Sequence, residues 1–416
     1  MKNFSARFLL ILLLAVFASL PALAAEPDAS TAADDEPAGD MPSDLPGYSM
    51  DRLKRLADSL QRTGVGTDQI TALHRPQYLN ISDASLSMDD DEIVFVVHYP
   101  QGPIRIYPQR IMVWHEVVND VLPDAEGNLP TQQARLAASG ALPLVGRLGA
   151  ETQGQSWTIS YSPLTGSVSA FHSSVAGKYP TSFGVTGNLI NGNSVLYDRI
   201  SGSLWAQLPA VCVEGPFKGR RLDRIPVLWA RWGGVKERYA RRAEVLSRST
   251  GHKRPYGKDP YGSYQVKGSY YDDVRLLFAI SRLDNRLPPK KRILGIEHEA
   301  LFGAVIVDEV REKRVLNFNL GLIPLVALYD AELDAVRIFD RRLNGQPLNF
   351  TLFEDGIVDE QTKSQWTPEG LGTYGRWRDQ KLTPVLAVDA MWYAWAAFYP
   401  DTQIFPYEDR LKQLKP

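Results

Sequence analysis

The densest set of side chains that could do chemistry lies at residues 114–120, which read Trp-His-Glu-Val-Val-Asn-Asp. On a helix, His115 and Asn119 would share one face. His-Glu invites comparison with the H-E-x-x-H motif of zinc proteases, but Asn119 replaces the second histidine, and one face then lacks the paired imidazoles that zinc needs. The sequence disfavours zinc proteolysis. It favours a structural role, with His115 and Asn119 bonding the backbone, over a catalytic role for His115 and Glu116.

A second candidate is Ser162, within residues 160–166, a predicted strand that runs into a tight turn. Ser162 could be a nucleophile only with a base beside it. His172 lies ten residues further on, and we expect it across the same hairpin. The candidate catalytic residues are therefore His115, Glu116 and Ser162, and the candidate metal ligands are His115, Glu116 and His172. No cofactor is assigned, since the chain has no Walker loop, dinucleotide fingerprint or paired-cysteine metal motif.

The elements that must position these residues are predicted to be mainly strands. Residues 49–61 carry apolar side chains at helical spacing. Residues 93–99 and 104–107 then predict two strands around a turn. Pro108 begins a predicted helix that runs through Val118, so the His-Glu pair would follow a β-hairpin directly.

The order strand, turn, strand, helix recurs about 200 residues later, at residues 293–314. Residues 198–205 match 359–366, each segment beginning with aspartate and ending with tryptophan. An ordered series of matches indicates one structural plan used twice. The offset falls to about 165 after the first match, which an insertion at residues 121–155 in the first copy would explain.

We therefore predict an α+β fold, predominantly antiparallel β, with two tandem pseudo-repeat lobes and short helices. The predicted segments are a signal peptide at 1–24, a disordered leader at 25–48, a first β-rich lobe at 75–247, a connecting loop at 248–284 and a second β-rich lobe at 285–407.

The N-terminus has the three parts of a secretory signal. Lys2 and Arg7 precede an apolar run at residues 8–20, and small residues allow cleavage after Ala24. Thirteen apolar residues are too few to span roughly 30 Å of hydrocarbon as a permanent helix. We expect a periplasmic or secreted protein with no integral membrane segment after cleavage.

Composition limits the classes of partner that this protein is expected to bind. The formal net charge is −2, and no strongly basic field exists for nucleic acid, so we expect no nucleic-acid partner. The single cysteine, Cys212, cannot form an internal disulfide, and we expect it to be a small buried side chain. The Gly- and Tyr-rich segment 249–271 resists helix and strand. This loop is a candidate binding site for a cell-wall or glycan partner in the envelope, and a small molecule is an alternative ligand of the protein.

Several motifs carry a family resemblance. Tyr-Ser-Pro-Leu-Thr-Gly at 161–166, Phe-Gly-Val-Thr-Gly-Asn-Leu at 183–189 and Trp-Tyr-Ala-Trp-Ala-Ala-Phe at 392–398 resemble the family called domain of unknown function 3179, over most of residues 90–405. The resemblance implies no assigned activity. Members typically carry Tyr-Cys-Pro-Leu-Cys where this chain has Ser162 and Thr165. Two thiols suit a soft metal or a redox pair, whereas two hydroxyls do not.

Two hypotheses about function follow. The first is a non-catalytic periplasmic binding or scaffold protein, indicated by the export signal and the incomplete catalytic set. The second is a metal-handling protein or enzyme with a site around His115, Glu116 and Ser162. The sequence favours the first hypothesis and leaves the question of catalysis open.

Overall fold

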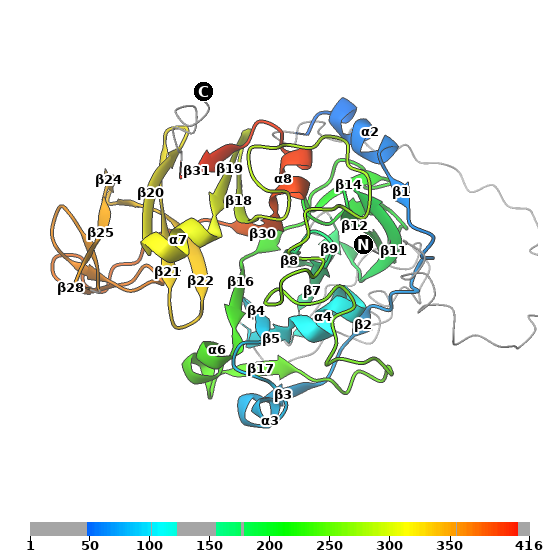
Figure 1. Ribbon diagram of the computed structural model, residues 1–416, viewed down its shortest axis with the longest axis horizontal. Helices are drawn as coiled ribbons and strands as arrows, with labels where there is room; N and C mark the ends of the chain where they lie inside the picture. Colours follow the sequence, from blue (N-terminus) through cyan, green and yellow to red (C-terminus); the bar gives the residue numbers. More distant parts are fainter. Residues whose placement is uncertain (1–47, 101, 123–154, 176–178, 355, 407–416) are drawn as a thin grey trace, which may run out of the picture. The chain divides into compact units, whose positions relative to one another are not determined.

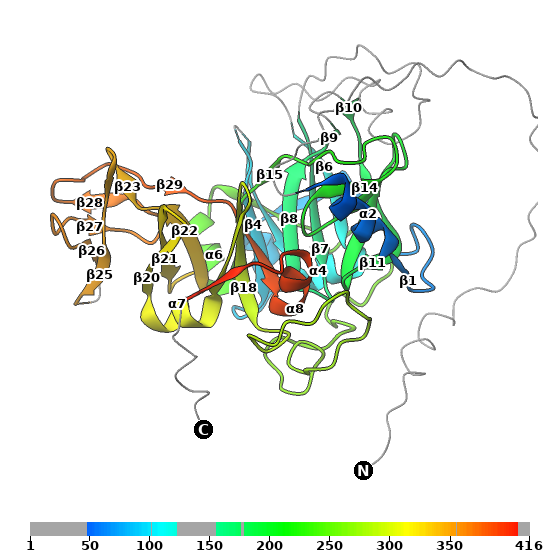
Figure 2. The same ribbon diagram turned by 90° about the horizontal axis from the view of Figure 1, so that it is seen from above.

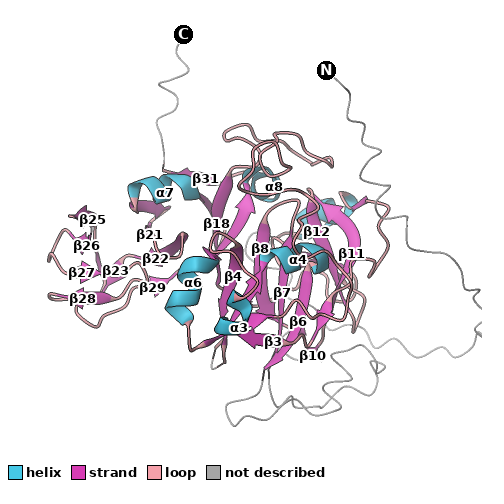
Figure 3. Cartoon of the chain, turned by 60° about the horizontal axis from the view of Figure 1, so that its bottom comes forward, coloured by secondary structure: helices cyan, strands magenta, loops and turns pink. Residues whose placement is uncertain are grey.

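The computed structural model describes residues 48–100, 102–122, 155–175, 179–354 and 356–406 (Figure 1). The signal peptide expected at 1–24, nearly all of the leader expected at 25–48 and most of the insertion expected at 121–155 lie outside the described residues. Strands dominate the rest, as Figure 3 shows. Six short helices occur in these ranges: α2 at Met50–Asp58, α3 at Ile81–Ser85, α4 at Gln109–His115, α6 at Trp232–Tyr239, α7 at Val307–Lys313 and α8 at Trp392–Phe398.

Three five-stranded sheets build the N-terminal part of the described chain. Sheet 1 has the order β16-β4-β5-β17-β3, with strands at Val227–Arg231, Ile93–His98, Ile104–Pro108, Ala243–Leu246 and Tyr78–Asn80. Sheet 2 has the order β15-β8-β7-β6-β2, with strands at Arg224–Ile225, Ser167–His172, Gln155–Ser162, Val117–Leu122 and Leu73–His74. Sheet 3 has the order β1-β11-β12-β13-β14, with strands at Gln61–Arg62, Phe183–Ile190, Asn193–Asp198, Leu204–Ala206 and Val211–Glu214.

Three four-stranded sheets build the C-terminal part, drawn in yellow to red in Figure 1. Sheet 4 has the order β30-β18-β19-β31, with strands at Ala387–Met391, Arg292–His298, Leu301–Ile306 and Gln403–Phe405. Sheet 5 has the order β20-β21-β22-β29, at Val315–Leu320, Ile323–Asp330, Ala335–Asp340 and Thr383–Pro384. Sheet 6 has the order β25-β26-β27-β28, at Phe350–Phe353, Gly356–Asp359, Gln365–Trp366 and Gly372–Tyr374.

Two small hairpins complete the set of described strands. They are β9 (Ser174–Val175) with β10 (Tyr179–Pro180), and β23 (Arg342–Leu343) with β24 (Gln346–Pro347). Pairings are antiparallel except β17 with β5, β31 with β19 and β2 with β6, which are parallel. The expectation of a predominantly antiparallel β fold with short helices is confirmed.

Sheet 2 is buried on both faces, and strand β7 shows how its sequence fits that position. Trp157, Ile159 and Tyr161 belong to the apolar core shared with sheet 1. The alternate side chains Thr158 and Ser162 face sheet 3, because side chains along a strand point in turn to opposite faces. Strand β7 is therefore buried on the face that carries its polar side chains as well as on its apolar face.

The predicted helix through Val118 is wrong in its last three residues. Helix α4 ends at His115, and Glu116 has a left-handed backbone with φ of 56°. Val117 and Val118 begin strand β6 and pair with Ser160 and Ile159 of β7. β-branched side chains lose rotamer freedom in a helix and pack well in a sheet, which explains the change of element at this point. His115 and Asn119 consequently share no helical face.

The expected burial of Cys212 is confirmed, because its side chain is 0% exposed. No helix or strand lies between residues 247 and 291, which contains the predicted connecting loop at 248–284. The four tryptophans of segments 229–232 and 392–395 are at most 5% exposed. No helix among the described residues is long and apolar enough to cross a membrane.

Candidate functional site

Glu116 is a buried carboxylate at the junction of helix α4 and strand β6. Its backbone N–H donates to the Met112 carbonyl (2.7 Å) and so ends the helix. Its carbonyl accepts from the N–H of Tyr161 in β7 (2.8 Å), which ties the junction to sheet 2. The residue is 6% exposed, and burial raises the pKa of its carboxyl to about 7. A buried carboxyl with a strongly shifted pKa is a feature that functional sites often share.

A chain of hydroxyl groups connects this carboxyl to Ser162. Ser194 in strand β12 donates from Oγ to Glu116 Oε2 at 2.8 Å. The same Oγ lies 3.0 Å from Ser162 Oγ, and the Ser194 N–H donates to Ser162 Oγ at 3.2 Å. A hydroxyl has one proton. When Ser194 donates to Glu116, Ser162 is left to donate to Ser194. The three groups form one path for a proton between sheets 2 and 3.

A buried polar layer continues from this path. The two protons of Asn193 Nδ2 are shared among three acceptors: Thr165 Oγ1 at 3.0 Å, Ser167 Oγ at 2.9 Å and Gln207 Oε1 at 2.9 Å. Gln207 in turn donates to the Ser160 carbonyl at 3.1 Å. Every one of these side chains is at most 1% exposed. The hydroxyls where the resemblance implies cysteines, at 162 and 165, are thus both bonded within the layer.

Two hydroxyls of the same layer stand apart from this network. The Oγ atoms of Ser160 and Ser169 are buried, and they make no hydrogen bond with the part of the chain that the structure describes. The face of sheet 2 toward sheet 3 therefore carries small polar side chains beyond those of the network.

The connecting loop lies over the turn that follows Ser162. The hydroxyls of Tyr270 and of Tyr393 in α8 both donate to the Leu164 carbonyl, at 2.7 and 2.9 Å. The turn residue Gly166 has φ of +57°, and an added Cβ there would lie 3.1 Å from the Tyr264 hydroxyl. Figure 2 shows the loop, in yellow-green, running beside α8 and α4. Ser162 itself is 0% exposed.

His115 is held by hydrogen bonds away from the hydroxyl chain. Its Nδ1 lies 2.7 Å from the Thr71 carbonyl, and its Nε2 lies 2.7 Å from the Tyr256 hydroxyl. Burial lowers the pKa of the imidazole to about 4, with the Thr71 bond opposing the shift and nearby His252 and Arg254 adding to it. A neutral ring then donates from Nδ1 to Thr71 and accepts at Nε2 from Tyr256. Both nitrogens are occupied by structural bonds.

Asn119 also makes the backbone bonds that its structural role requires. Its Nδ2 donates to the Phe183 carbonyl at 2.8 Å, and its Oδ1 accepts from the Phe183 N–H at 2.8 Å. The side chain thereby joins β6 to the start of β11.

His172 does not join the other candidates. It lies in β8, across the hairpin as expected, but it pairs with Trp157, whereas Ser162 pairs with Ser167 at the turn. Five residues of strand separate the two pairs, about 17 Å at the usual rise. The ring packs edge-on against Trp157, with centroids 5.0 Å apart. Within the described residues, no three His, Cys, Asp or Glu side chains are grouped as metal ligands.

The structure thus brings Glu116 and Ser162 together and leaves both histidines outside. Sequence reasoning missed Ser194, which supplies the connection, because it is 32 residues from Ser162 and belongs to no recognisable motif. One signal was present: Asn193 and Ser194 begin an otherwise apolar strand segment.

A pocket of about 400 Å³ lies outside the hydroxyl chain, where the turn at residues 89–92, the start of α4 and the connecting loop at 257–265 meet. Gln109 connects the pocket to the core, because its Nε2 donates to Asp259 (2.7 Å) and lies 3.4 Å from the Tyr161 hydroxyl.

The model of the family described as "Protein of unknown function (DUF3179)" matches residues 67–128 and 148–402. The chain belongs to the DUF3179 family. The match includes Glu116, Ser162, Ser194 and the pocket, so all these features of the DUF3179 protein lie within the family domain. No match was found to a curated protein or to a solved structure.

Proposed function

We propose that this DUF3179 protein is an exported, non-catalytic binding protein. One observation carries the proposal: Ser162 and Glu116, the two candidate catalytic residues that meet, are 0% and 6% exposed beneath the connecting loop. A nucleophile must come within about 3–3.5 Å of its substrate. A substrate of Ser162 would first have to displace the Leu164 turn from Tyr270 and Tyr393.

Export is proposed on the N-terminal sequence. A basic start, a thirteen-residue apolar run and small residues before the cleavage point at Ala24 have the order of a signal peptide. The protein would then act in the periplasm or outside the cell. A non-catalytic binding or scaffold role needs no thiol chemistry there, in keeping with a single buried cysteine, Cys212.

We also propose that the body arose by tandem duplication. The order β16-β4-β5-β17 of sheet 1 corresponds to β30-β18-β19-β31 of sheet 4, including the parallel last pair. The Trp205 indole donates to Asp198 Oδ2 at 2.9 Å, and the Trp366 indole donates to Asp359 Oδ2 at 3.1 Å. The two sets of bonds support the sequence match between residues 198–205 and 359–366.

A second candidate function is proton transfer at Glu116, which the raised pKa of its carboxyl favours. General acid–base catalysis works best when the pKa lies near the working pH, and burial brings Glu116 to about 7. In that reading Glu116 is the acid or base, and Ser194 passes the proton between Ser162 and Glu116. The connecting loop would have to open for any substrate.

Reactivity of Ser162 separates the two functions. Native mature protein would be treated with a fluorophosphonate, and modified serines would be mapped by mass spectrometry. The binding proposal predicts no modification of Ser162. Stoichiometric modification of Ser162 that is lost in Glu116→Gln would overturn the proposal and establish the second candidate.

Metal content is the companion measurement. We expect the purified mature protein to carry no stoichiometric metal that depends on His115, since both ring nitrogens are already bonded to Thr71 and Tyr256. Stoichiometric metal that is lost in His115→Ala would contradict this and favour a metal-handling role.

A further inference from the structure

The pocket of about 400 Å³ is bounded by three segments that are distant in sequence. The acidic turn supplies Asp89, Asp91 and Glu92, helix α4 supplies Gln109 and Arg110, and the connecting loop supplies residues 257–265. The Gln265 side chain donates to the Asp91 carbonyl at 3.0 Å and so holds the loop against the turn. A volume of this size is typical of small-molecule sites.

The charge of the pocket is strongly negative. Four of its twelve lining residues are acidic, namely Asp89, Asp91, Glu92 and Asp259, and Arg110 is the one basic residue among them. Arg110 is already paired with Glu92 at 2.9 Å. The side chains of Asp89 and Asp91 are exposed and make no hydrogen bond or ion pair within the described ranges. Two carboxylates therefore remain available to a ligand.

An amide acceptor adds a second observation. Gln109 is 7% exposed and lines the pocket. Its Nε2 is used by Asp259 and Tyr161, but its Oε1 makes no hydrogen bond among the residues that the structure describes. An amide oxygen that has no donor within the chain can accept a hydrogen bond from a ligand N–H. The free polar groups of the pocket are thus acceptors.

The remaining wall suits a short hydrocarbon chain. Ile93 and Tyr264 line the same pocket. The Tyr264 ring is fixed by stacking on Tyr271 at 3.7 Å and by edge contact with Trp229 at 5.2 Å. A rigid aromatic face beside carboxylates favours an alkylammonium ligand, because its charge can pair with the carboxylates while its methylene groups pack against the ring.

We propose that this pocket binds a small organic cation with several N–H donors, of the alkyl diamine class. The proposal rests on the proposed binding function and specifies its ligand. The ammonium groups would bind Asp89, Asp91 and Gln109 Oε1, and the chain between them would lie against Ile93 and Tyr264.

Isothermal titration at low ionic strength tests the proposal with three four-carbon probes: 1,4-diaminobutane, 1,4-butanediol and succinate. We expect 1:1 binding of the diamine and none of the diol or the dianion. The variant Asp89→Asn/Asp91→Asn should bind the diamine more weakly by about tenfold for each carboxylate removed. The matched variant Glu237→Gln/Asp401→Asn removes two exposed carboxylates elsewhere and should bind as the parent does.

Three results would overturn the cation assignment: no binding of the diamine, tighter binding of succinate or the diol, or unchanged affinity in Asp89→Asn/Asp91→Asn. None of these results concerns Ser162. Failure of the ligand assignment is therefore distinguishable from failure of the proposed function, which the fluorophosphonate reaction of Ser162 reports.

Discussion

The Ser194 hydroxyl donates a hydrogen bond of 2.8 Å to the Glu116 carboxylate across the interface of sheets 2 and 3. It is the one side-chain hydrogen bond to this carboxyl within the described residues, and no cation is paired with it. A carboxylate charge in such surroundings is poorly compensated, because burial removes water without supplying a positive partner. Glu116 is consequently protonated more readily than a surface glutamate.

The first prediction concerns the pH dependence that Glu116 confers. The folded pKa of about 7 lies above the ordinary value of 4.5, so the folded state binds the proton more tightly than the unfolded state. The stabilisation that this proton binding gives the folded state is complete below about pH 4.5 and is lost as pH rises to about 7. Above that pH, Glu116 no longer changes the free energy of unfolding. Relative to wild type, Glu116→Gln should gain on the order of 3 kcal/mol in free energy of unfolding between pH 4.5 and 8.

Urea denaturation at several pH values measures this difference. The exposed Glu214→Gln is the matched control and should show a difference that does not vary with pH. A pH-independent difference for Glu116→Gln would contradict the burial argument.

The second prediction concerns His115, whose titration has the opposite sign. Burial lowers the folded pKa to about 4 from 6.5, so the protein keeps the ring neutral while the unfolded chain takes up a proton. Stability from this residue is present above pH 6.5 and is lost as pH falls to about 4, by on the order of 3 kcal/mol. His115→Gln should remove that loss.

Chemical denaturation between pH 4 and 7.5 tests this, with the exposed His298→Gln as the control. If the difference between wild type and His115→Gln stays constant over this range, His115 is not held neutral by burial.

The bounds of two strands near the site were readable from the sequence. The hairpin of β4 and β5 begins and ends within one residue of the ranges expected from apolar runs and the Pro100–Pro103 turn. The predicted continuation of helix α4 through Val118 was wrong, because the apolar residues at 111, 114, 117 and 118 also fit a helical face. The left-handed Glu116 is set by pairing of Val117 with β7, a contact that periodicity does not encode.

The polar core was less readable than the strands. Alternating polar residues such as Thr158, Ser160 and Ser162 ordinarily indicate a strand with one wet face. Here sheet 3 packs against that face and buries it, and this packing is visible only in the tertiary structure. Glu116 and Ser162 were chosen as candidates from local motifs. Their link through Ser194 depends on the packing of two sheets.

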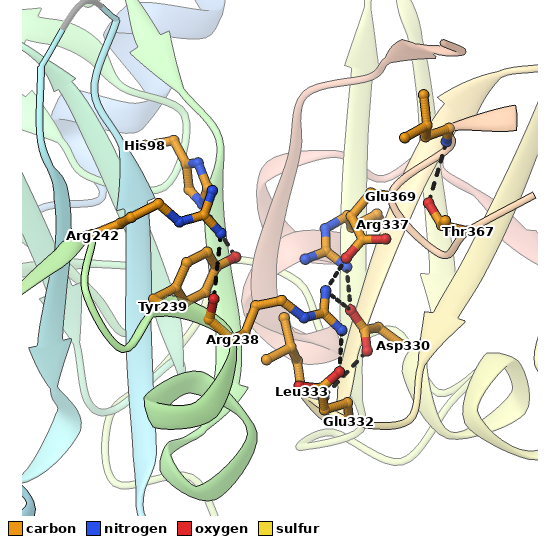
Figure 4. A network of polar contacts seen from close by, with 11 residues as sticks. His98, Arg238, Tyr239, Arg242, Asp330, Glu332, Leu333, Arg337, Thr367 and Glu369 are labelled. Atoms are coloured by element: carbon orange, nitrogen blue, oxygen red, sulfur yellow. Dashed lines mark hydrogen bonds and ion pairs between the residues drawn. The ribbon is translucent and has the colours of Figure 1, made fainter. Parts of the chain in front are cut away.

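The third prediction concerns Arg238 in helix α6, which contacts the C-terminal part of the chain (Figure 4). Its guanidinium reaches Asp330 (3.4 Å) and also pairs with Glu332 and Glu369. Asp330 has a side chain only 2% exposed and keeps Arg337 as a second partner. We expect Arg238→Ala to lose about 1–2 kcal/mol of unfolding free energy, because the remaining ion pair compensates the buried charge only in part.

Hydrogen–deuterium exchange locates this effect. Amides of residues 330–337 should exchange faster in Arg238→Ala, whereas the exposed Arg241→Ala should leave them unchanged. Equal exchange in the two variants would mean that the network adds nothing to this contact.

The fourth prediction tests the central claim, that the Glu116–Ser194–Ser162 site is closed to solvent. Ser162→Cys places a thiol at the position, and its reaction with a small disulfide reagent is followed in native and in unfolded protein. Cys212 is 0% exposed and should not react with the reagent in native protein. Ser249→Cys, at an exposed loop position, provides the reactive control.

The decisive measurement is the labelling rate of native Ser162→Cys relative to native Ser249→Cys at the same pH. A closed site predicts labelling at least about a hundredfold slower than the control, with the introduced thiol and Cys212 both reacting only after unfolding, since a buried thiol neither ionises readily nor meets the reagent. Native labelling at a rate close to that of Ser249→Cys would show an open site, and the non-catalytic account of this DUF3179 protein would then be wrong.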